Sequence, residues 1–594
     1  MKKSIIAFAL LAVFTAGAFA NDRGISDRSK RTVADGPHPR VFGYANAVAY
    51  GAPGNPDNLL TDIAFNVTID PNGNSAERVF FLSIRNQATG AVRYIDTSGL
   101  LDEGVLRAMN GTGPDNFTAN AVTTLDDVTL VGDGGVVTGA IGSDALGTGN
   151  YQICLDLREG SGQRTVTKSC FNFSIVDALV LVDANISGDS TWTSNNAYFI
   201  NNQTIFVDPG GTLTIEPGTV VFGTGQVSAL VVDRGGQIFA NGTQARPIIM
   251  TSANDVGERT RAQWGGLIIN GRAPINTGEQ QGEGGTRLFG GDDPEDDSGS
   301  LTYVRVEFAG IEFSPDNELN GIAFQGVGRG THVSHIQVHF NQDDGVEFFG
   351  GTVDAKYVLT TGIGDDNIDW VLGWIGRLQF AVAQQRPDDG DQGIEADNLE
   401  NNNNLLPRSN PTLYNITLVG VPTSSSSDIG MLLREGTAGK LRNGIVTGFN
   451  DDAVDIDFVA TVDQINSGDL TVRNFIFWDN KCDVQDGVVV SCPNDATQFD
   501  TDDSGEEDDA GITPGTTQDF ITSEPTNRLV NPGLRDPFSE LAPDFRPQLN
   551  SSALNRNFVE IPPDDGFFCT TIDFIGGVDP TDDWTQGWTY FGPF

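Results

Sequence analysis

From residue 178 onward the chain consists of short apolar runs separated by turn residues. Examples lie within residues 211–222, 229–240 and 247–251, where Val, Ile, Leu and Phe dominate and Pro-Gly or Gly-Gly pairs interrupt the runs. Val, Ile and Phe favour extended strands, and these dipeptides favour turns. Each strand is too short to bury a core alone, so the strands are predicted to stack on one another.

An acidic repeat in the second half of the chain supports this stacking. Segments 343–347, 365–369, 391–395 and 451–455 share the order acidic, polar, small or polar, aliphatic, acidic. The first three begin 22 and 26 residues apart, and the longer gap before the fourth leaves room for a turn that contains Asp428. Three short strands and three turns need about this many residues. Residues 178–594 are therefore predicted to form a right-handed parallel β-helix with acidic loop insertions.

The first 177 residues follow a different pattern. Residues 1–20 contain two lysines, an apolar stretch and a small-residue end, which is the order of a secretory signal peptide. Residues 21–39 are polar without periodicity and are expected to form a flexible leader. In residues 40–177, short alternating runs are separated by Gly, Asn, Asp and Pro. This spacing favours an immunoglobulin-like β-sandwich, so the whole protein is predicted to be all-β.

Charge and export narrow the classes of partner. The signal peptide predicts a secreted protein, extracellular or on the outer cell surface, with the periplasm as an alternative. No later segment has the roughly 20 apolar residues of a membrane-spanning helix, so none is expected in the mature chain. The formal net charge of −45 repels nucleic acid and anionic membranes. Cations, neutral glycans and basic surfaces remain as partners.

Five cysteines in an exported chain favour disulfide bonds with one thiol left over. Cys154 and Cys170 lie in two short alternating segments that are expected to pair as antiparallel strands. Cys482 and Cys492 enclose a short loop. We therefore predict the disulfide bonds Cys154–Cys170 and Cys482–Cys492, and we expect Cys569 to be free or bonded to another chain.

Five longer motifs occupy residues 213–218, 264–271, 343–351, 364–370 and 583–588. In these motifs the sequence resembles bacterial secreted right-handed parallel β-helix surface proteins, which are mostly of unassigned function. The resemblance covers roughly residues 180–594. It implies the fold of that region and a surface protein, but it implies no particular activity.

Equivalent positions in successive turns of a β-helix lie about 4.8 Å apart, so the acidic repeat is expected to form columns. Unneutralised carboxylates at that spacing repel one another, and calcium binds several carboxylate oxygens at once. The alternative is that these side chains cap turns by accepting backbone hydrogen bonds. We predict calcium as the cofactor, with ligands from two neighbouring columns: Asp343, Asp365, Asp391 and Asp451, and beside them Asp344, Asp366 and Asp452.

A third acidic column is expected to face outward and would contain Glu347, Asp369, Glu395 and Asp455. Tryptophan rings stack on sugars, although they also complete β-helix turns. The candidate ligand-binding residues are therefore Glu347, Asp369, Trp370, Trp374 and Glu395. On another strand, His335 and His339 are about 13 Å apart, which is too far for them to share one metal ion. We therefore expect them to form a solvated ladder.

The catalytic alternatives depend on what surrounds these columns. Paired carboxylates suit an inverting glycosidase. A calcium-dependent polysaccharide lyase would need a basic residue, for which the candidates are Lys356, Arg377, Arg386, Arg408 and Arg434. An isolated arginine on an acidic scaffold more often pairs with Asp or Glu.

Because no catalytic base is recognisable, the sequence favours a calcium-stabilised surface or extracellular binding protein whose β-helix face binds a glycan or another cell-surface component. Two alternatives stay open. One is an enzyme, a lyase or glycosidase acting on acidic polysaccharide. The other is a structural element of an extracellular layer or filament.

Overall fold

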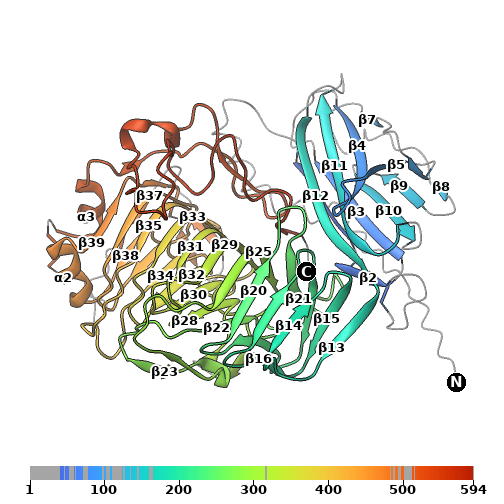
Figure 1. Cartoon of the computed structure of the whole chain (residues 1–594). Helices are drawn as coiled ribbons and strands as arrows, with labels where there is room; N and C mark the ends of the chain where they lie inside the picture. Colours follow the sequence, from blue (N-terminus) through green and yellow to red (C-terminus); the bar gives the residue numbers. More distant parts are fainter. Residues whose placement is uncertain are drawn as a thin grey trace.

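A computed structural model of the chain shows an almost entirely β structure (Figure 1). It describes residues 40–45, 47–51, 59–60, 62–70, 78–96, 99–101, 107–109, 123–124, 128–133, 136–142, 146–159, 165–314, 317–481, 483–485, 488–491, 497–500, 511–513 and 515–592. The predicted signal peptide, the predicted leader, Cys482 and Cys492 lie outside these residues.

The N-terminal part forms the predicted β-sandwich. One sheet has the order β1 (Arg40–Ala45), β3 (Asp62–Asp70), β10 (Val136–Gly142), β9 (Val128–Asp133) and β8 (Thr123–Thr124). The other has the order β2 (Ala49–Gly51), β12 (Thr165–Val176), β11 (Gly149–Glu159), β4 (Arg78–Asn86), β5 (Val92–Asp96) and β6 (Gly99–Leu101), with β7 (Arg107–Met109) beside β4. Phe65 from the first sheet and Ile153 from the second share one buried apolar core.

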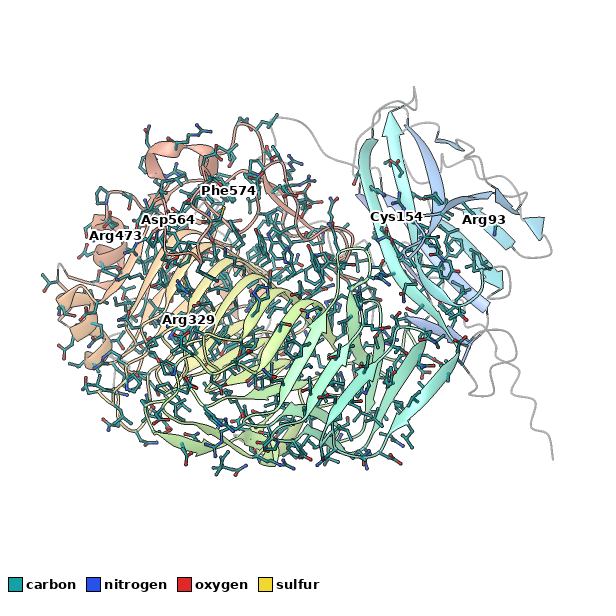
Figure 2. The ribbon with its side chains drawn as sticks, viewed as in Figure 1. Arg93, Cys154, Arg329, Arg473, Asp564 and Phe574 are labelled. Atoms are coloured by element: carbon teal, nitrogen blue, oxygen red, sulfur yellow. A yellow bond between two sulfur atoms is a disulfide. The ribbon has the colours of Figure 1, made fainter. Side chains whose placement is uncertain are left out.

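The predicted disulfide bond of this sandwich is confirmed. Cys154 on β11 lies directly opposite Cys170 on β12 in the antiparallel register, and their Cα atoms are 4.2 Å apart. Figure 2 marks Cys154 within the sandwich. Cys569 forms no disulfide bond with another described cysteine.

The rest of the chain winds into the predicted right-handed parallel β-helix, whose turns stack in two long sheets (Figure 1). The first parallel sheet contains β13 (Ala178–Val182), β15 (Asn196–Asn201), β18 (Val220–Thr224), β21 (Ile248–Ser252), β25 (Gly299–Glu307), β29 (His332–His339), β31 (Asp354–Thr361), β33 (Arg377–Gln384), β35 (Thr412–Val419), β37 (Gly439–Thr447), β40 (Ile476–Trp478) and β43 (Arg528–Leu529). The strands β14 (Asp189–Trp192), β17 (Thr212–Ile215), β20 (Gln237–Asn241) and β39 (Leu470–Arg473) join it at the side.

The second parallel sheet runs along the other side of the coil. It contains β16 (Thr204–Val207), β19 (Ala229–Val232), β22 (Leu267–Asn270), β28 (Ile322–Gln325), β30 (Val346–Phe349), β32 (Ile368–Val371), β34 (Ile394–Ala396), β36 (Met431–Leu433) and β38 (Asp455–Ile456). Inward-facing side chains of both sheets form one continuous apolar core. Near one end, α2 (Val459–Ser467) adds Val462 and Ile465 to this core. The remaining elements in that region are α3 (Thr517–Ser523), β41 (Asp483–Gln485) and β42 (Val488–Ser491).

Each long strand of the first parallel sheet bends at one residue with a left-handed backbone. The register skips at this position, since Thr302 pairs with Ser334 and Val304 with Ile336. Tyrosine, histidine and phenylalanine rarely adopt this conformation, but here successive ring centroids stack at 4.2, 4.2 and 5.0 Å. The bend residues, with φ between 50° and 63°, are Tyr303, His335, Tyr357, Phe380, Asn415, Asn443 and Asn474.

The C-terminal segment, residues 530–592, folds back over the outer face of the first parallel sheet. Figure 2 shows Phe574 of this segment above the strands. The segment contains β44 (Leu534–Asp536), β45 (Asp544–Pro547) and the short 3₁₀ helices Ser552–Leu554 and Arg556–Phe558. Side-chain amides of the first parallel sheet hydrogen-bond to the backbone of the C-terminal segment. Each amide accepts from the N–H and donates to the C=O of one residue of that segment. Gln337 binds the N–H and C=O of Tyr590, Gln379 those of Cys569, and Asn443 those of Glu560.

This cover corrects the prediction of a solvated histidine ladder. His339 is fully buried, and burial holds its pKa well below the usual value. His335 stacks between Tyr303 and Tyr357, and burial lowers its pKa to about 4. The strand pattern placed these polar side chains outward correctly. It could not indicate that a segment some 250 residues later would cover them.

Replacing Asn443 by Ala tests how much this cover contributes to stability. The substitution removes two hydrogen bonds to Glu560, of 2.8 and 2.9 Å, from a fully buried side chain, and it leaves alanine at φ 56°. We expect a loss of roughly 2 kcal/mol in the free energy of unfolding, measured by urea denaturation. The control is Asn410→Ala at an exposed position. Equal unfolding midpoints for the two variants would contradict the role of Asn443.

Candidate functional site

The outward column of the second parallel sheet changes from apolar to acidic along the coil. The strand registers align Ile268, Ala323, Glu347, Asp369 and Glu395 in that order. The predicted stacking of the last three is therefore present. Leu432 follows Glu395, so Asp455 is separated from the column by one turn.

Two hairpins cover the apolar half of this face. The first hairpin consists of β23 (Glu279–Gln281) and β24 (Leu288–Gly290), joined through the 3₁₀ turn Glu283–Gly285. Its Phe289 packs in one cluster with Ile268 and Ala323. The second hairpin pairs β26 (Glu312–Ser314) with β27 (Asn317–Glu318). The next residues of the outward column, Glu347 and Asp369, are acidic.

The two columns of turn aspartates are also present in part. Backbone hydrogen bonds of 3.1–3.2 Å join Asp365, Asp391, Asp428 and Asp451 in successive turns. In the neighbouring column, the backbone N–H of Asp366 donates to Asp344 Oδ1 at 3.1 Å, and that of Gln392 donates to Asp366 Oδ1 at 2.8 Å. These aspartates therefore accept hydrogen bonds from the next turn, as the turn-capping interpretation requires.

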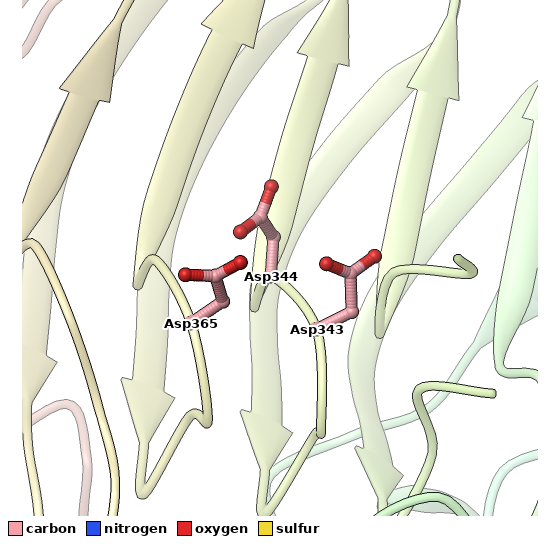
Figure 3. A group of neighbouring side chains, drawn as sticks. All are labelled: Asp343, Asp344 and Asp365. Carbon is pink, nitrogen blue, oxygen red and sulfur yellow. The ribbon is translucent and has the colours of Figure 1, made fainter. Parts of the chain in front are cut away.

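Three groups of carboxylates have ligand atoms within 4.8 Å of one another, close enough to share a metal ion. Figure 3 shows the first group, with Asp343 and Asp344 on one turn and Asp365 on the next. The groups are Asp343, Asp344 and Asp365; Asp344, Glu347 and Asp369; and Asp365, Asp366 and Asp391. Asp451 and Asp452, which were also predicted as ligands, belong to none of the three.

Burial and crowding raise the pKa of these carboxyl groups. Burial is the main cause, and neighbouring carboxylates add to it. The pKa of Asp391 rises to about 7, and that of Asp428 to about 6. The pKa values of the other members lie well above the usual range, in Asp343, Asp344, Glu347, Asp366 and Asp369. Holding all of these groups ionised would require a compensating positive charge.

Sequence reasoning missed two acidic residues that join this cluster. Glu283 of the first hairpin and Glu318 of the second both raise the pKa of Asp343 by repulsion. The pKa of Glu283 itself rises to about 7, through burial and then through Glu318. Both residues lie in loop insertions outside the acidic repeat, so no periodic signal pointed to them.

Little positive charge balances the cluster from within the protein. Arg434 forms ion pairs with Glu395 and Asp397 at one edge. No described hydrogen-bond donor reaches Oδ1 of Asp369, which is buried. An unsatisfied, buried carboxylate oxygen beside other carboxylates fits a hard cation such as calcium, which prefers oxygen ligands. The acidic clusters are thus suited to hold a metal ion.

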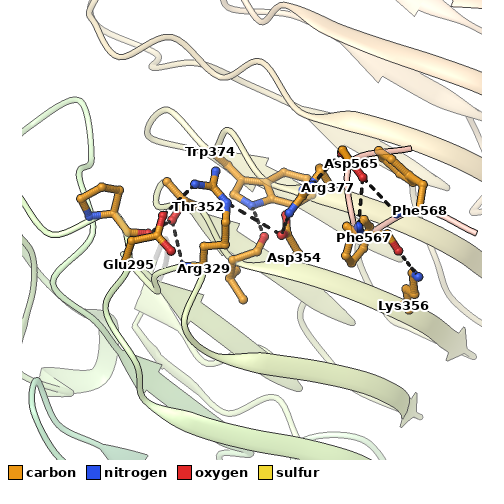
Figure 4. Close-up of polar contacts among 12 residues, drawn as sticks. Glu295, Arg329, Thr352, Asp354, Lys356, Trp374, Arg377, Asp565, Phe567 and Phe568 are labelled. Carbon is orange, nitrogen blue, oxygen red and sulfur yellow. Dashed lines mark hydrogen bonds and ion pairs between the residues drawn. The ribbon is translucent and has the colours of Figure 1, made fainter. Parts of the chain in front are cut away.

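The basic candidates for lyase chemistry are bound elsewhere. Arg377 pairs with Asp354 and Asp565, and Lys356 donates to the carbonyl of Phe567 (Figure 4). Arg386 pairs with Glu540. Arg408 donates to the carbonyls of Asn403 and Gly436 and to the side chain of Asn404. The prediction that such arginines pair with acidic residues is confirmed for Arg377, Arg386 and Arg434.

The prediction that Trp370 and Trp374 stack on a sugar is wrong. Both rings are fully buried in the coil core, where Trp374 stacks on Phe348 at a centroid distance of 4.0 Å. Strand alternation gives the reason, because Asp369 faces outward and the next residue must face inward. Glu347 and Asp369 face away from the core as expected, but they are only 7% and 8% exposed. Glu395 is half-buried.

A comparison with protein families agrees with the observed fold. A family model described as a pectate-lyase-like beta helix domain matches residues 184–519, more than half of the chain. The catalytic unit of a thermostable GH87 alpha-1,3-glucanase from Streptomyces thermodiastaticus is 10% identical, and the match covers 78% of this chain and 97% of that one with a TM-score of 0.28. For a family 28 exopolygalacturonase from Yersinia enterocolitica these values are 12%, 74%, 85% and 0.21.

No curated protein matches the sequence. The two structural similarities are too low to carry an argument about activity. None of the helices within the described ranges has the length and hydropathy needed to cross a membrane.

The raised pKa values predict an unusual dependence of stability on pH. A carboxyl group with a folded-state pKa above its unfolded value stabilises the fold at low pH, and this contribution is lost as pH rises through the folded pKa. For Asp391 and Asp428 that loss falls between about pH 4 and 7. In chelator, the melting temperature should be lower at pH 8 than at pH 5, by differential scanning fluorimetry.

Two groups work in the opposite direction over this interval, because burial lowers the pKa of His335 to about 4 and that of His339 well below the usual value, so both stabilise the fold more at pH 8 than at pH 5. The pKa values of Asp208 and Asp565 are lowered too, but their contribution is already complete above about pH 5. The raised carboxyl groups of the acidic columns outnumber the two histidines, so the net sign should hold. Calcium added at pH 8 is the control and should narrow the difference. A cation-free protein that melts higher at pH 8 than at pH 5 would contradict the electrostatic description of the acidic columns.

Proposed function

This chain belongs to the family of pectate-lyase-like β-helix domains, and from that premise we propose that it is an exported, calcium-stabilised protein that binds a glycan along the acidic edge of its β-helix. The observation that carries the proposal is the row of stacked carboxylates from Asp343 to Asp391. These groups crowd together on consecutive turns with almost no basic partner.

Calcium is the proposed cation because the available ligands are carboxylate and backbone oxygens in irregular turns. Calcium accepts six to eight such ligands in flexible geometry, whereas zinc prefers nitrogen and sulfur. In the first and third groups Asp343, Asp365 and Asp391 are half-buried, so an ion held by these side chains is accessible from solvent. Such an ion would supply positive charge and open coordination positions to which sugar hydroxyl or carboxylate groups can bind.

Binding is preferred over lyase chemistry because of the partners of the basic residues. A lyase needs a basic side chain beside the cation to remove a proton. Arg434 is the basic residue that pairs with the acidic columns, and Glu395 and Asp397 hold it. Arg377 and Arg386 are paired with other segments. A protein with these contacts would retain an acidic or neutral polysaccharide rather than cleave it by elimination.

Removing charge from the outer column tests the calcium site. The triple variant Asp343→Asn, Asp365→Asn, Asp391→Asn keeps the ability of these side chains to cap turns but removes three carboxylates. Wild-type protein should gain about 2.7 kcal/mol of stability at a calcium concentration one hundred times the Kd. The triple variant should lose most of that gain, measured as the shift in melting temperature between calcium and chelator.

The matched control is the double variant Asp255→Asn, Glu258→Gln, which removes exposed charges away from the columns. It should respond to calcium as the wild type does. A triple variant with the full calcium response would place the ion elsewhere, and a wild type that ignores calcium would leave turn capping as the role of these aspartates.

Glycan binding can be measured with the same proteins. We expect polygalacturonate or another uronate polymer, immobilised on resin, to retain the wild type in calcium and to release it in chelator. The triple variant should elute early under both conditions. Ultraviolet absorbance of unsaturated products, followed over a day, should not rise. Rising absorbance would favour a lyase, and elution in the void volume from every glycan tested would contradict the proposed function.

A further inference from the structure

The second carboxylate group, formed by Asp344, Glu347 and Asp369, is enclosed rather than open. All three side chains are buried. Asn320, which is 1% exposed, donates from Nδ2 to Glu347 Oε2 at 2.5 Å. The Oδ1 atom of Asn320 and the Oδ1 atom of Asp369 have no hydrogen-bond partner among the described residues. A buried neutral side chain with an unpaired acceptor thus joins three buried carboxylates.

The same group is linked to the two hairpins that cover the apolar half of the sheet. Asn320 lies two residues after Glu318, the last residue of β27. The neighbouring Asn317 accepts a hydrogen bond of 2.7 Å from the backbone N–H of Gly284, at the tip of the first hairpin. The Phe313 ring lies directly against Gly284, leaving no room there for a Cβ atom. A continuous set of contacts therefore runs from Glu347 to the tip that carries Glu283.

The two ends of the first hairpin differ in the charges that they meet. Arg234 binds both Glu279 and the carbonyl of Gly290, the paired residues at the open end of the hairpin. Arg287 forms ion pairs with Asp208 and Asp233. At the tip, by contrast, acidic Glu283 meets acidic Glu318 and Asp343.

We propose that the enclosed group of Asp344, Glu347 and Asp369 binds one divalent, oxygen-preferring cation, and that this ion fixes the tip of the first hairpin, at Glu283–Gly285, against the β-helix. The inference deepens the proposed function and rests on it for the choice of calcium. The enclosed ion is structural, because its three carboxylate ligands are buried and a polysaccharide cannot reach them. It differs in this respect from an ion in the half-buried outer groups, which a glycan can contact.

The physical reason is charge balance. Without a cation, the ionised carboxylates of the group repel Glu283, and the tip of the first hairpin moves away from the sheet. A divalent cation neutralises most of the negative charge of the group, so this repulsion weakens and the tip rests against the sheet. The hairpins lie at the boundary between the apolar and the acidic part of the outer face of the second parallel sheet. Their position therefore sets one end of the glycan-binding edge.

Limited trypsin digestion of the full-length protein tests this inference, because Arg287 lies on the first hairpin and its side chain is 38% exposed. We expect cleavage after Arg287 to be at least tenfold slower in calcium than in chelator, with mass spectrometry identifying the products. Cleavage after Arg556, whose side chain is 76% exposed and lies in the C-terminal segment, serves as the internal control and should change little.

Two variants separate the inference from its alternatives. Asp369→Asn should abolish the protection of Arg287 by calcium. The double variant Glu283→Gln, Glu318→Gln should protect Arg287 even in chelator, because the repulsion at the tip of the first hairpin is gone. This variant keeps the inference testable if Asp369→Asn does not fold. Equal cleavage of the wild type in calcium and chelator would overturn the proposal, as would full calcium protection in Asp369→Asn.

Retention on uronate resin, measured on the same samples, distinguishes this inference from the proposed function. Loss of calcium protection at Arg287 together with normal glycan retention overturns the enclosed site alone. Calcium protection at Arg287 without any glycan retention supports the enclosed site and overturns the proposed glycan binding alone.

Discussion

In-register parallel stacking is the constraint on which the rest of this structure depends. Each turn places equivalent side chains about 4.8 Å from those of the turns before and after it. Inside the coil this repetition is favourable, because rows of Val, Ile and Leu bury one another continuously. Outside the coil the same repetition builds ladders of whatever residue occupies the position. A ladder of carboxylates is therefore a direct consequence of the repeat, and it needs hydrogen bonds, protons or cations to be stable.

The side chains on the outer faces of the coil are covered by other segments or paired in charge in three different ways. The first parallel sheet has apolar and aromatic residues outside, and the C-terminal segment covers them, with Trp588 and Trp584 against the row that includes Tyr357. The apolar half of the second sheet is covered by a hairpin through Phe289. On the acidic half of that sheet Glu347 and Asp369 are buried as well, but among the described residues only Arg434 forms an ion pair with this column, at one edge. The unbalanced charge is thus concentrated at one place on the molecule.

This concentration connects fold to function. The buried pair formed by Arg305 and Glu307, whose nearest atoms are 2.7 Å apart, shows the contrast, because each of these charges has a partner of opposite sign within the chain. Leaving a row of carboxylates without such partners is costly unless something outside the chain binds there. A cation meets that need, and a cation with open positions also provides a means of holding an acidic or hydroxyl-rich polymer.

The sequence by itself determined the all-β class, the coil, the sandwich, the Cys154–Cys170 bond and the stacking of Glu347, Asp369 and Glu395, because each depends on periodicity along the chain. Only the tertiary structure decided which of these side chains are exposed. It buried Trp370, covered His339 with a distant segment, and brought Glu283 and Glu318 to the acidic group. Contacts between the loop insertions and the turns of the coil do not recur at a fixed spacing, so the sequence pattern does not predict them. The repeat of the coil can be predicted, because every turn shows the same order of apolar and polar residues.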